Sequence, residues 1–184
     1  MEIETLAISG LLVLKPSVFE DSRGYFIESF NQNTFQETTG LSMAFVQDNE
    51  SMSNKGVLRG LHFQVPPHAQ DKLVRVVRGS VLDVAVDLRK GSPTYGEHAK
   101  MILSADNKKQ FLIPKGFAHG FLVLEDNTIF SYKCSGFYHQ ASDRTLKWND
   151  PDIGIEWGVE NPSLSQKDRD AEMTIKTFNS PFMG

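Results

Sequence analysis

The chain has a single cysteine, Cys134, so it cannot form an internal disulfide. This scarcity is typical of a reducing compartment, and we expect a cytoplasmic protein. No stretch approaches the ~20 apolar residues that a membrane-spanning helix needs. The short apolar run near the N-terminus follows acidic residues, whereas a signal peptide begins with basic ones. We therefore expect no membrane association.

The chain also lacks an excess of positive charge. Its 19 Lys and Arg residues are outnumbered by 23 Asp and Glu residues, which gives a formal net charge of −4. No overall field therefore draws the protein to nucleic acid, and we expect no such partner. An anionic ligand has to be held by a local cluster of Arg and Lys side chains.

Repeats and low-complexity tracts are absent, and 184 residues suit one domain, which we place at residues 1–184. Turn signals, among them residues 54–56 and 90–93, recur at short intervals between runs of Val, Ile, Leu, Phe and Tyr. Evenly spaced short strands of this kind predict an all-β sandwich or barrel. Helical patterns are scarce: we expect one short helix at residues 34–39, between an Asn33 N-cap and Gly40, and a second near residues 166–171.

Two predicted strands have unusual patterns of side chains on their faces. Residues 81–88 alternate so that Asp83 and Asp87 share one face and the larger aliphatic residues share the other. Those acids indicate either a solvated face or a polar cavity. The segment Gly24–Phe30 has bulky apolar residues on both faces, which is typical of a strand that packs across a subunit boundary.

Two segments contain residues capable of chemistry. In Arg59-Gly60-Leu61-His62-Phe63-Gln64 the glycine lets backbone or ligand approach closely, although a lone histidine such as His62 is more often structural. In residues 113–121 the pattern Pro-x-Gly-x-x-His resembles the second motif of the cupin superfamily, whose histidine enters a barrel. The first cupin motif supplies further histidines and a Glu as metal ligands, whereas here His62 is followed by Gln64 and Lys72. Because amides bind transition metals weakly and ammonium groups do not bind them, we expect no metal.

Each of the other candidate residues can be explained by an ordinary structural role as well as by a functional one. Lys72 opens a strand at residues 73–77 and faces the same cavity as His62 if the strands at 57–63 and 72–78 are neighbours, but most lysines are solvated. Tyr132 and Tyr138 suit a pocket or the aromatic edge of a core. Asp168 suits a turn cap.

Taken together, these segments resemble the dTDP-4-dehydrorhamnose 3,5-epimerase family from about residue 3 to residue 170. The resemblance rests on their order along the chain: residues 19–28, 45–49, 57–64, 83–89, 113–121, 132–133 and 164–168. It implies a cupin-like jelly roll, a double-stranded β-helix with one or two short helices. It also implies a homodimer with shared active sites, a dTDP-4-keto-6-deoxy sugar as substrate, and no cofactor.

The resemblance assigns roles to individual residues. His62 matches the general base, Asp168 the acid that orients it, Tyr132 the proton donor and Lys72 the group that steadies the enolate. The expected substrate-binding residues are Phe19, Arg23, Phe26, Glu28, Gln47, Asp48, Asn49, Arg59, Lys72, His119, Tyr138, Asp143 and Lys167. Arg23 and Glu28 are expected to serve the neighbouring subunit's site, and Asp143 stands where the family is expected to have Glu.

The residue types agree with this chemistry. Protons alpha to a ketone are removed by a base, and the resulting enolate needs a cation or donor at its oxygen and an acid on the opposite face. Three alternatives stay open: an epimerase of one carbon only, a metal-dependent cupin, and a nucleotide-sugar binding protein without catalysis. No Gly-x-Gly-x-x-Gly fingerprint for a nicotinamide cofactor is present.

Overall fold

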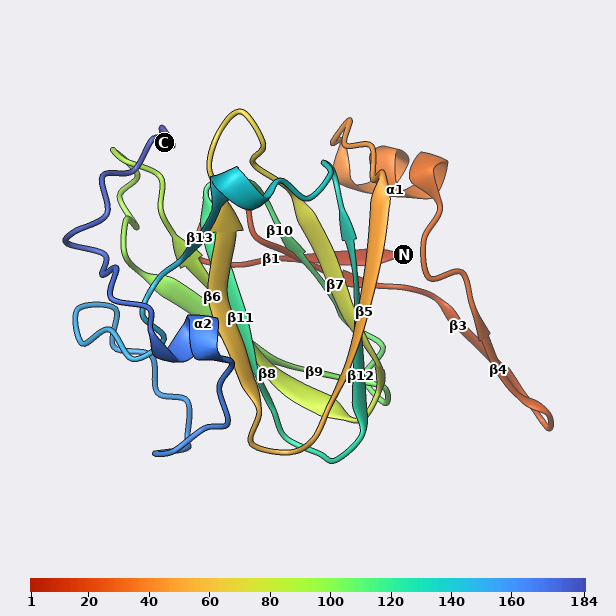
Figure 1. The fold of residues 1–184 in the computed structure, drawn as a ribbon. Coiled ribbons are helices and arrows are strands. Elements are labelled where there is room, and N and C mark those ends of the chain that lie inside the picture. The colour runs from red at the N-terminus through yellow and green to blue at the C-terminus, as the bar shows by residue number, and fades with distance from the viewer.

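The computed structural model describes residues 1–184, and its main strands form two facing antiparallel sheets that close into a barrel (Figure 1). The six-stranded sheet has the order β1 (Glu2–Thr5), β2 (Leu12–Lys15), β10 (Gln110–Ile113), β7 (Lys72–Arg78), β12 (Thr128–Cys134) and β5 (Gln47–Ser53). The five-stranded sheet has the order β13 (Asp143–Thr145), β6 (Leu58–Gln64), β11 (Phe117–Val123), β8 (Ser80–Asp87) and β9 (His98–Ser104). This confirms the predicted jelly roll.

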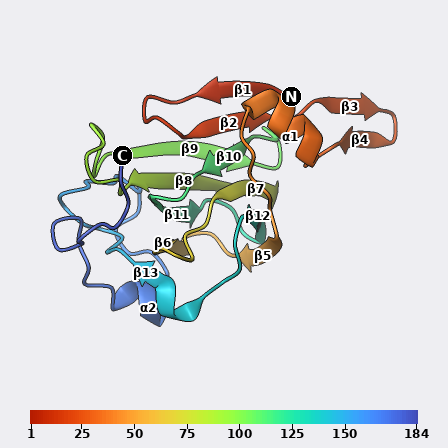
Figure 2. The same cartoon turned by 90° about the horizontal axis from the view of Figure 1, so that it is seen from above.

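The strands that carry His62 and Lys72 are not neighbours in one sheet, which was the condition we set for a shared cavity. Strands β6 and β7 lie in opposite sheets. They face one another across the barrel, which Figure 2 shows from above. Residues on their inner faces therefore still share one cavity.

Apolar side chains fill one part of the barrel interior and cover both of its outer faces. The interior cluster includes Phe111, Phe121 and Phe130, which are at most 5% exposed. The coil after β13 covers the outer face of the five-stranded sheet with side chains such as Trp157 and Phe182. Both surfaces of β8 are buried as a result, although its faces alternate as predicted. Asp83 and Asp87 are fully buried, so the solvated alternative for these acids was wrong.

A close approach between two strands explains the glycine in Arg59-Gly60-Leu61-His62. Gly60 has a φ of 137°, a conformation that side chains rarely allow, and a Cβ there would lie 2.5 Å from the Cα of Gly120 in β11. The expected close backbone approach at this glycine is confirmed. It brings β6 and β11 together next to His62 and His119, which are paired in register.

Two short α-helices are present, and neither is long and apolar enough to cross a membrane. Helix α1 (Gln32–Thr39) ends at Gly40 as predicted, but Asn31 and not Asn33 is the N-cap, since its side chain accepts the amide hydrogens of Asn33 and Thr34. Phe35 of α1 is fully buried against the outer face of the six-stranded sheet. Helix α2 (Gln166–Arg169) is shorter than the predicted 166–171, and a 3₁₀ turn, η1 (Gln140–Ser142), precedes β13.

A hairpin of β3 (Val18–Asp21) and β4 (Gly24–Ile27) projects from the body of the molecule (Figures 1 and 2). The strand predicted at Gly24–Phe30 ends at Ile27, because Phe30 turns inward to pack on Phe35 and Phe45. At the hairpin, Phe19 and Phe26 are 63% and 67% exposed. Large exposed aromatic side chains on a projecting element are typical of a protein–protein contact.

Candidate active site

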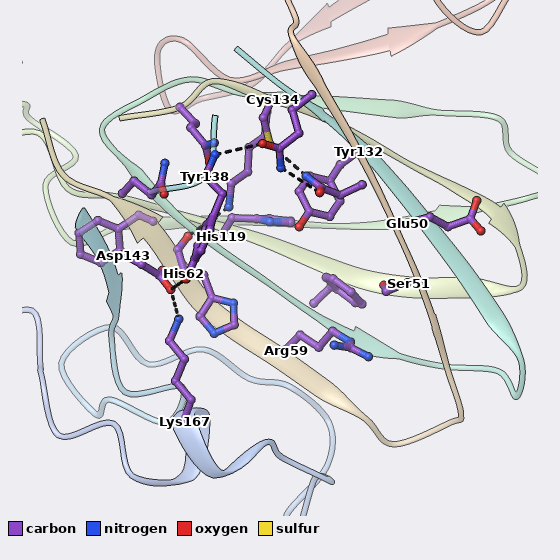
Figure 3. Close-up of a pocket in the computed structure, with 17 residues that line it drawn as sticks. Glu50, Ser51, Arg59, His62, His119, Tyr132, Cys134, Tyr138, Asp143 and Lys167 are labelled. Atoms are coloured by element: carbon purple, nitrogen blue, oxygen red, sulfur yellow. Dashed lines mark hydrogen bonds and ion pairs between the residues drawn. The ribbon is translucent and has the colours of Figure 1, made fainter. Parts of the chain in front are cut away.

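A cavity of about 560 Å³ lies between the two sheets and opens to the surface. It has polar walls: most lining side chains carry nitrogen or oxygen, and only five of 17 are hydrophobic (Figure 3). The structure brings these sequence-predicted residues together around it: Gln47, Asn49, Arg59, His62, Lys72, His119, Tyr132, Tyr138, Asp143 and Lys167.

His62 and Asp168 form a close pair behind one wall of this cavity. His62 Nε2 lies 2.5 Å from Asp168 Oδ1, and the hydroxyl of Ser165 donates to Asp168 Oδ2 at 2.9 Å. Burial alone would raise the pKa of Asp168, but hydrogen bonds from His62 and Ser165 and the charge of His62 outweigh it, so the pKa is lowered. Ser165 is also the N-cap of α2, so this short helix fixes the carboxylate. The imidazole is therefore oriented by an ionised carboxylate, with Nδ1 left for other contacts.

Tyr132 comes from the opposite wall. Its strand, β12, belongs to the six-stranded sheet, whereas His62 is on β6 of the five-stranded sheet. Figure 3 shows both side chains at the cavity. Burial raises the pKa of Tyr132. The phenol thus stays protonated at neutral pH and is able to donate a proton.

Lys72 provides a positive charge at the cavity, close to the backbone of His62. Its Nζ donates to the backbone carbonyl of His62 at 3.4 Å. Burial lowers the pKa of Lys72, while the charges of Cys134, Asp143 and Asp83 oppose that effect. An ammonium group in this position can stabilise negative charge that develops on a bound molecule.

A second histidine–carboxylate pair lies deeper in the barrel. His119 Nε2 is 3.0 Å from both carboxylate oxygens of Asp83, and both residues are buried. Burial lowers the pKa of His119 and raises that of Asp83, so desolvation disfavours the charged form of each. Asp83 therefore holds His119, whereas Asp168 holds His62.

Polar contacts also organise the rim of the cavity. The hydroxyl of Tyr138 donates to Asp143 Oδ2 at 3.2 Å, and Lys167 Nζ lies 2.5 Å from the same oxygen. On the adjacent strand β6, the Arg59 guanidinium donates to Ser53 Oγ at 3.2 and 3.0 Å. Arg59 and Lys167 thus place positively charged groups at the cavity of an otherwise acidic protein.

Several predicted binding residues lie outside this cavity. Phe19, Arg23 and Phe26 are on the projecting hairpin, where Arg23 pairs with Asp21. Glu28 accepts hydrogen bonds from Asn31 and Thr34 near α1. Asp48 pairs with Lys133, and the alternation of β5 turns it away from Gln47 and Asn49, so the cavity contact expected for Asp48 is absent. None of these side chains lines the cavity.

Sequence reasoning missed other lining residues, namely Glu50, Ser51, Phe63, Gln70, Phe121 and Cys134. A signal for three of them was present: Ser51, Phe121 and Cys134 each stand two positions after a predicted site residue, on the same strand face. Gln64 was considered only as a poor metal ligand, and it also lines the cavity. No three His, Cys, Asp or Glu side chains gather in a group that could hold a metal ion.

Comparisons with known proteins agree on one family. The family model described as dTDP-4-dehydrorhamnose 3,5-epimerase matches residues 5–175. The chain is 54% identical to a Shigella flexneri protein of that name over 168 residues, which cover 91% of this chain and 93% of that protein.

Solved structures of sugar-nucleotide epimerases are also similar to this chain. A Legionella pneumophila dTDP-6-deoxy-D-glucose-3,5-epimerase in complex with dTDP-4-keto-L-rhamnose has a TM-score of 0.95 and 44% identity, covering 100% of this chain and 98% of that one. A 3′-monoepimerase of Streptomyces bikiniensis in complex with dTDP-quinovose has a TM-score of 0.88 and 35% identity, covering 94% and 87%.

Proposed function

The chain belongs to the dTDP-4-dehydrorhamnose 3,5-epimerase family, and on this premise we propose that it inverts C3 and C5 of dTDP-4-dehydro-6-deoxy-D-glucose. The protein is an isomerase, and its reaction serves the synthesis of dTDP-L-rhamnose. Identity favours the double inversion over the alternative of a single one, because the chain is 54% identical to a 3,5-epimerase and 35% identical to a 3′-monoepimerase.

One observation carries the mechanism: His62, held by Asp168, and Tyr132 line the same cavity from opposite sheets. Inversion requires a proton to leave from one face of the sugar and another to arrive on the opposite face. His62 removes the proton from C3 or C5, and Asp168 keeps the imidazole in the orientation and tautomer that this needs. Tyr132 then delivers a proton from the other wall.

The intermediate is an enolate, since both protons are alpha to the C4 ketone. Its negative charge falls on the former ketone oxygen, where Lys72 provides stabilisation. Cavity walls that exclude bulk water strengthen this interaction. No hydride moves and no electron is transferred, so the reaction balances without a redox cofactor, and the proposed residues supply the acid, the base and the cation without a metal.

Anion-binding groups at the cavity suit a nucleoside diphosphate. Arg59 and Lys167 are candidates for the diphosphate, and His119 for a further polar contact deeper in the barrel. Gln47, Asn49 and Asp143 offer hydrogen bonds to sugar hydroxyls, and Tyr138 offers an aromatic face at the mouth.

The remaining predicted binding residues lie on or next to the hairpin, and we assign them to a partner's site in a homodimer. The exposed aromatic side chains of Phe19 and Phe26 support this assignment, because a second copy of the chain would cover them. Arg23 and Glu28 would then reach the substrate bound by the neighbouring subunit. A cytoplasmic location is part of the same proposal, supported by the single cysteine.

Solvent exchange tests the function directly. With dTDP-4-dehydro-6-deoxy-D-glucose in deuterated water, the protein should introduce deuterium at both C3 and C5 with inversion, as read by NMR. Deuterium at only one carbon would identify a single-carbon epimerase, and no deuterium at either would identify a binding protein.

Two variants separate the acid from the base. His62→Ala should lose exchange and inversion together, because no enolate forms. Tyr132→Phe should still exchange while inversion falls by about 10²-fold or more, the usual scale for losing one acid–base group. Normal inversion by Tyr132→Phe would transfer the acid role to another group.

A further inference from the structure

The residues 136–139, here called the rim segment, carry Tyr138 over the cavity mouth. This segment follows β12 and has little apolar packing of its own, since Phe137 is 71% and Tyr138 58% exposed. Segments with few buried apolar contacts open easily unless polar contacts hold them. The hydrogen bonds of this segment therefore decide where Tyr138 lies.

Glutamine side chains bind four of its backbone groups, beside the contact of the Tyr138 hydroxyl with Asp143. Gln70 donates to the carbonyl of Gly136 at 2.6 Å, and Gln64 donates to the carbonyl of Phe137 at 3.4 Å. Gln47 accepts from the amide of Tyr138 at 3.0 Å, and Gln64 accepts from the amide of His139 at 2.6 Å. Each residue of the rim segment thus has one backbone group bound by a glutamine.

These glutamines come from separate parts of the barrel. Gln47 is on β5 of the six-stranded sheet, Gln64 ends β6 of the five-stranded sheet, and Gln70 lies in the connection to β7. Gln64 is 6% exposed, and its amide also donates to the carbonyl of His68 at 2.7 Å. The rim segment is therefore tied to both walls of the cavity and to the preceding loop.

The amide group is the chemistry that this position requires. A glutamine donates and accepts at the same time, so Gln64 can bind a carbonyl and an N–H group in one place. A carboxylate keeps only the accepting function and would face two carbonyl oxygens. An apolar side chain would remove the hydrogen-bond partners of these backbone groups.

We propose that Gln47, Gln64 and Gln70 are positioning residues that hold the rim segment so that Tyr138 closes the cavity mouth over the bound sugar. They act through Tyr138 and not on the reacting carbons. This inference rests on the proposed function, since it concerns retention of the nucleotide sugar in that same cavity. The predicted substrate contact of Gln47 is then secondary to its contact with the Tyr138 amide.

Amide hydrogen exchange, measured without substrate, tests whether the three glutamines hold the rim segment. In Gln64→Met and Gln47→Met, the peptide covering residues 136–139 should exchange its amides about 10-fold faster than in the wild type, the scale of losing one or two neutral hydrogen bonds. Thr128→Val is the matched control. It removes one buried hydrogen bond, from Thr128 Oγ1 to the Glu125 carbonyl, in the turn at the other end of β12. It should leave exchange in the rim segment unchanged.

Kinetics test the consequence for the reaction. Both glutamine variants should raise KM by about 10-fold while kcat changes less, because ground-state retention is lost and the acid–base groups remain. Gln64→Glu adds a pH signature: burial raises the pKa of the new carboxyl, and its protonated form again donates and accepts. Its KM relative to the wild type at the same pH should therefore improve as the pH falls.

Two results would overturn the proposal: unchanged exchange in the rim segment of the glutamine variants, or faster exchange with an unchanged KM. The proposed function fails in a different way. Suppose that the wild type does not epimerise the nucleotide sugar but the variants exchange faster. The glutamines then do hold the rim segment, and only the link to this reaction is rejected.

Discussion

His62 Nε2 and Asp168 Oδ1 lie 2.5 Å apart although 106 positions separate these residues in the chain. Their contact links strand β6 to helix α2 and connects the cavity wall to the C-terminal coil. A carboxylate at Nε2 leaves Nδ1 as the nitrogen that can accept a proton from the substrate. The orientation of the imidazole thus depends on a residue that itself does not line the cavity.

Asp168→Asn should lower kcat by about 10² to 10⁴-fold with the fold intact, because an amide favours the wrong imidazole tautomer. Steady-state kinetics and circular dichroism check this. Ser165→Ala is the control, since it removes the second hydrogen bond to the carboxylate but leaves the charge, and its effect should stay below about 10-fold. Equal losses in both variants would show that the carboxylate acts only through the local structure.

The fall in activity at alkaline pH should be caused by deprotonation of Lys72. Its pKa is lowered, mainly by burial, so the ammonium loses its proton below the ordinary value of 10.5 as the pH rises. The pKa of Tyr132 is raised above 10.0, so the phenol keeps its proton in that range. Activity should therefore fall before pH 10.5, and Lys72→Arg should remove this fall at a lower absolute rate, since arginine stays charged. An unchanged fall in Lys72→Arg would assign the titration to another group.

Subunit mixing should reveal a shared site. Arg23→Ala and His62→Ala are each expected to be inactive, but a heterodimer of the two has one site with both residues intact. Random reassociation of equal amounts should restore about a quarter of the wild-type activity, because half of the dimers are mixed and each has one working site. Heterodimers that form and remain inactive would place Arg23 and His62 at the same subunit's site.

Removal of metal should have no effect on turnover. EDTA should leave kcat unchanged, and elemental analysis should find no stoichiometric transition metal. The reason is that Gln64 and Lys72 replace good ligands, and the Gln64 amide is already bound to backbone groups. A metal whose loss abolishes turnover would contradict the proposed acid–base mechanism.

Gly60→Ala should destabilise the protein strongly. A Cβ at this position would lie 2.5 Å from the Cα of Gly120, and its φ of 137° is already unfavourable for a side chain. The expected loss in free energy of unfolding is about 2–5 kcal/mol, the sum of a backbone and an overpacking contribution. Gly56→Ala is the control, since its φ of 84° is also positive but no atom lies within 4 Å, and it should lose only about 1–2 kcal/mol. Chemical denaturation of both variants would measure the difference.

Much of the site could be predicted from the sequence where the chemistry is local. Gly116 has a φ of 95° at a turn, and it directs His119 into the barrel as the Pro-x-Gly-x-x-His pattern indicates. The alternation of β8 correctly separated its two faces. What covers the outer face was not predictable from that strand, because the apolar residues of the C-terminal coil follow no helix or strand period.

Contacts between segments that are distant in the sequence account for most of what the sequence did not predict. The pairing of β7 with β10 and β12 leaves no local trace, so the sequence left open whether the strands of His62 and Lys72 are neighbours. Asn31 and Asn33 are equally good caps by composition, and the turn before α1 decides between them. The contacts of Gln47, Gln64 and Gln70 form only once the rim segment folds back over the cavity.

The projecting hairpin has a consequence for how such a protein can change over evolutionary time. Phe19 and Phe26 contribute nothing to the packed interior, so replacing them leaves the stability of the barrel almost untouched. Most natural proteins lie only slightly above the stability they need, and this restricts substitutions inside the core. The exposed hairpin, which we propose completes a neighbour's site, escapes that restriction. New ligand preferences can be explored at its tip while the acid–base machinery inside the barrel stays constant.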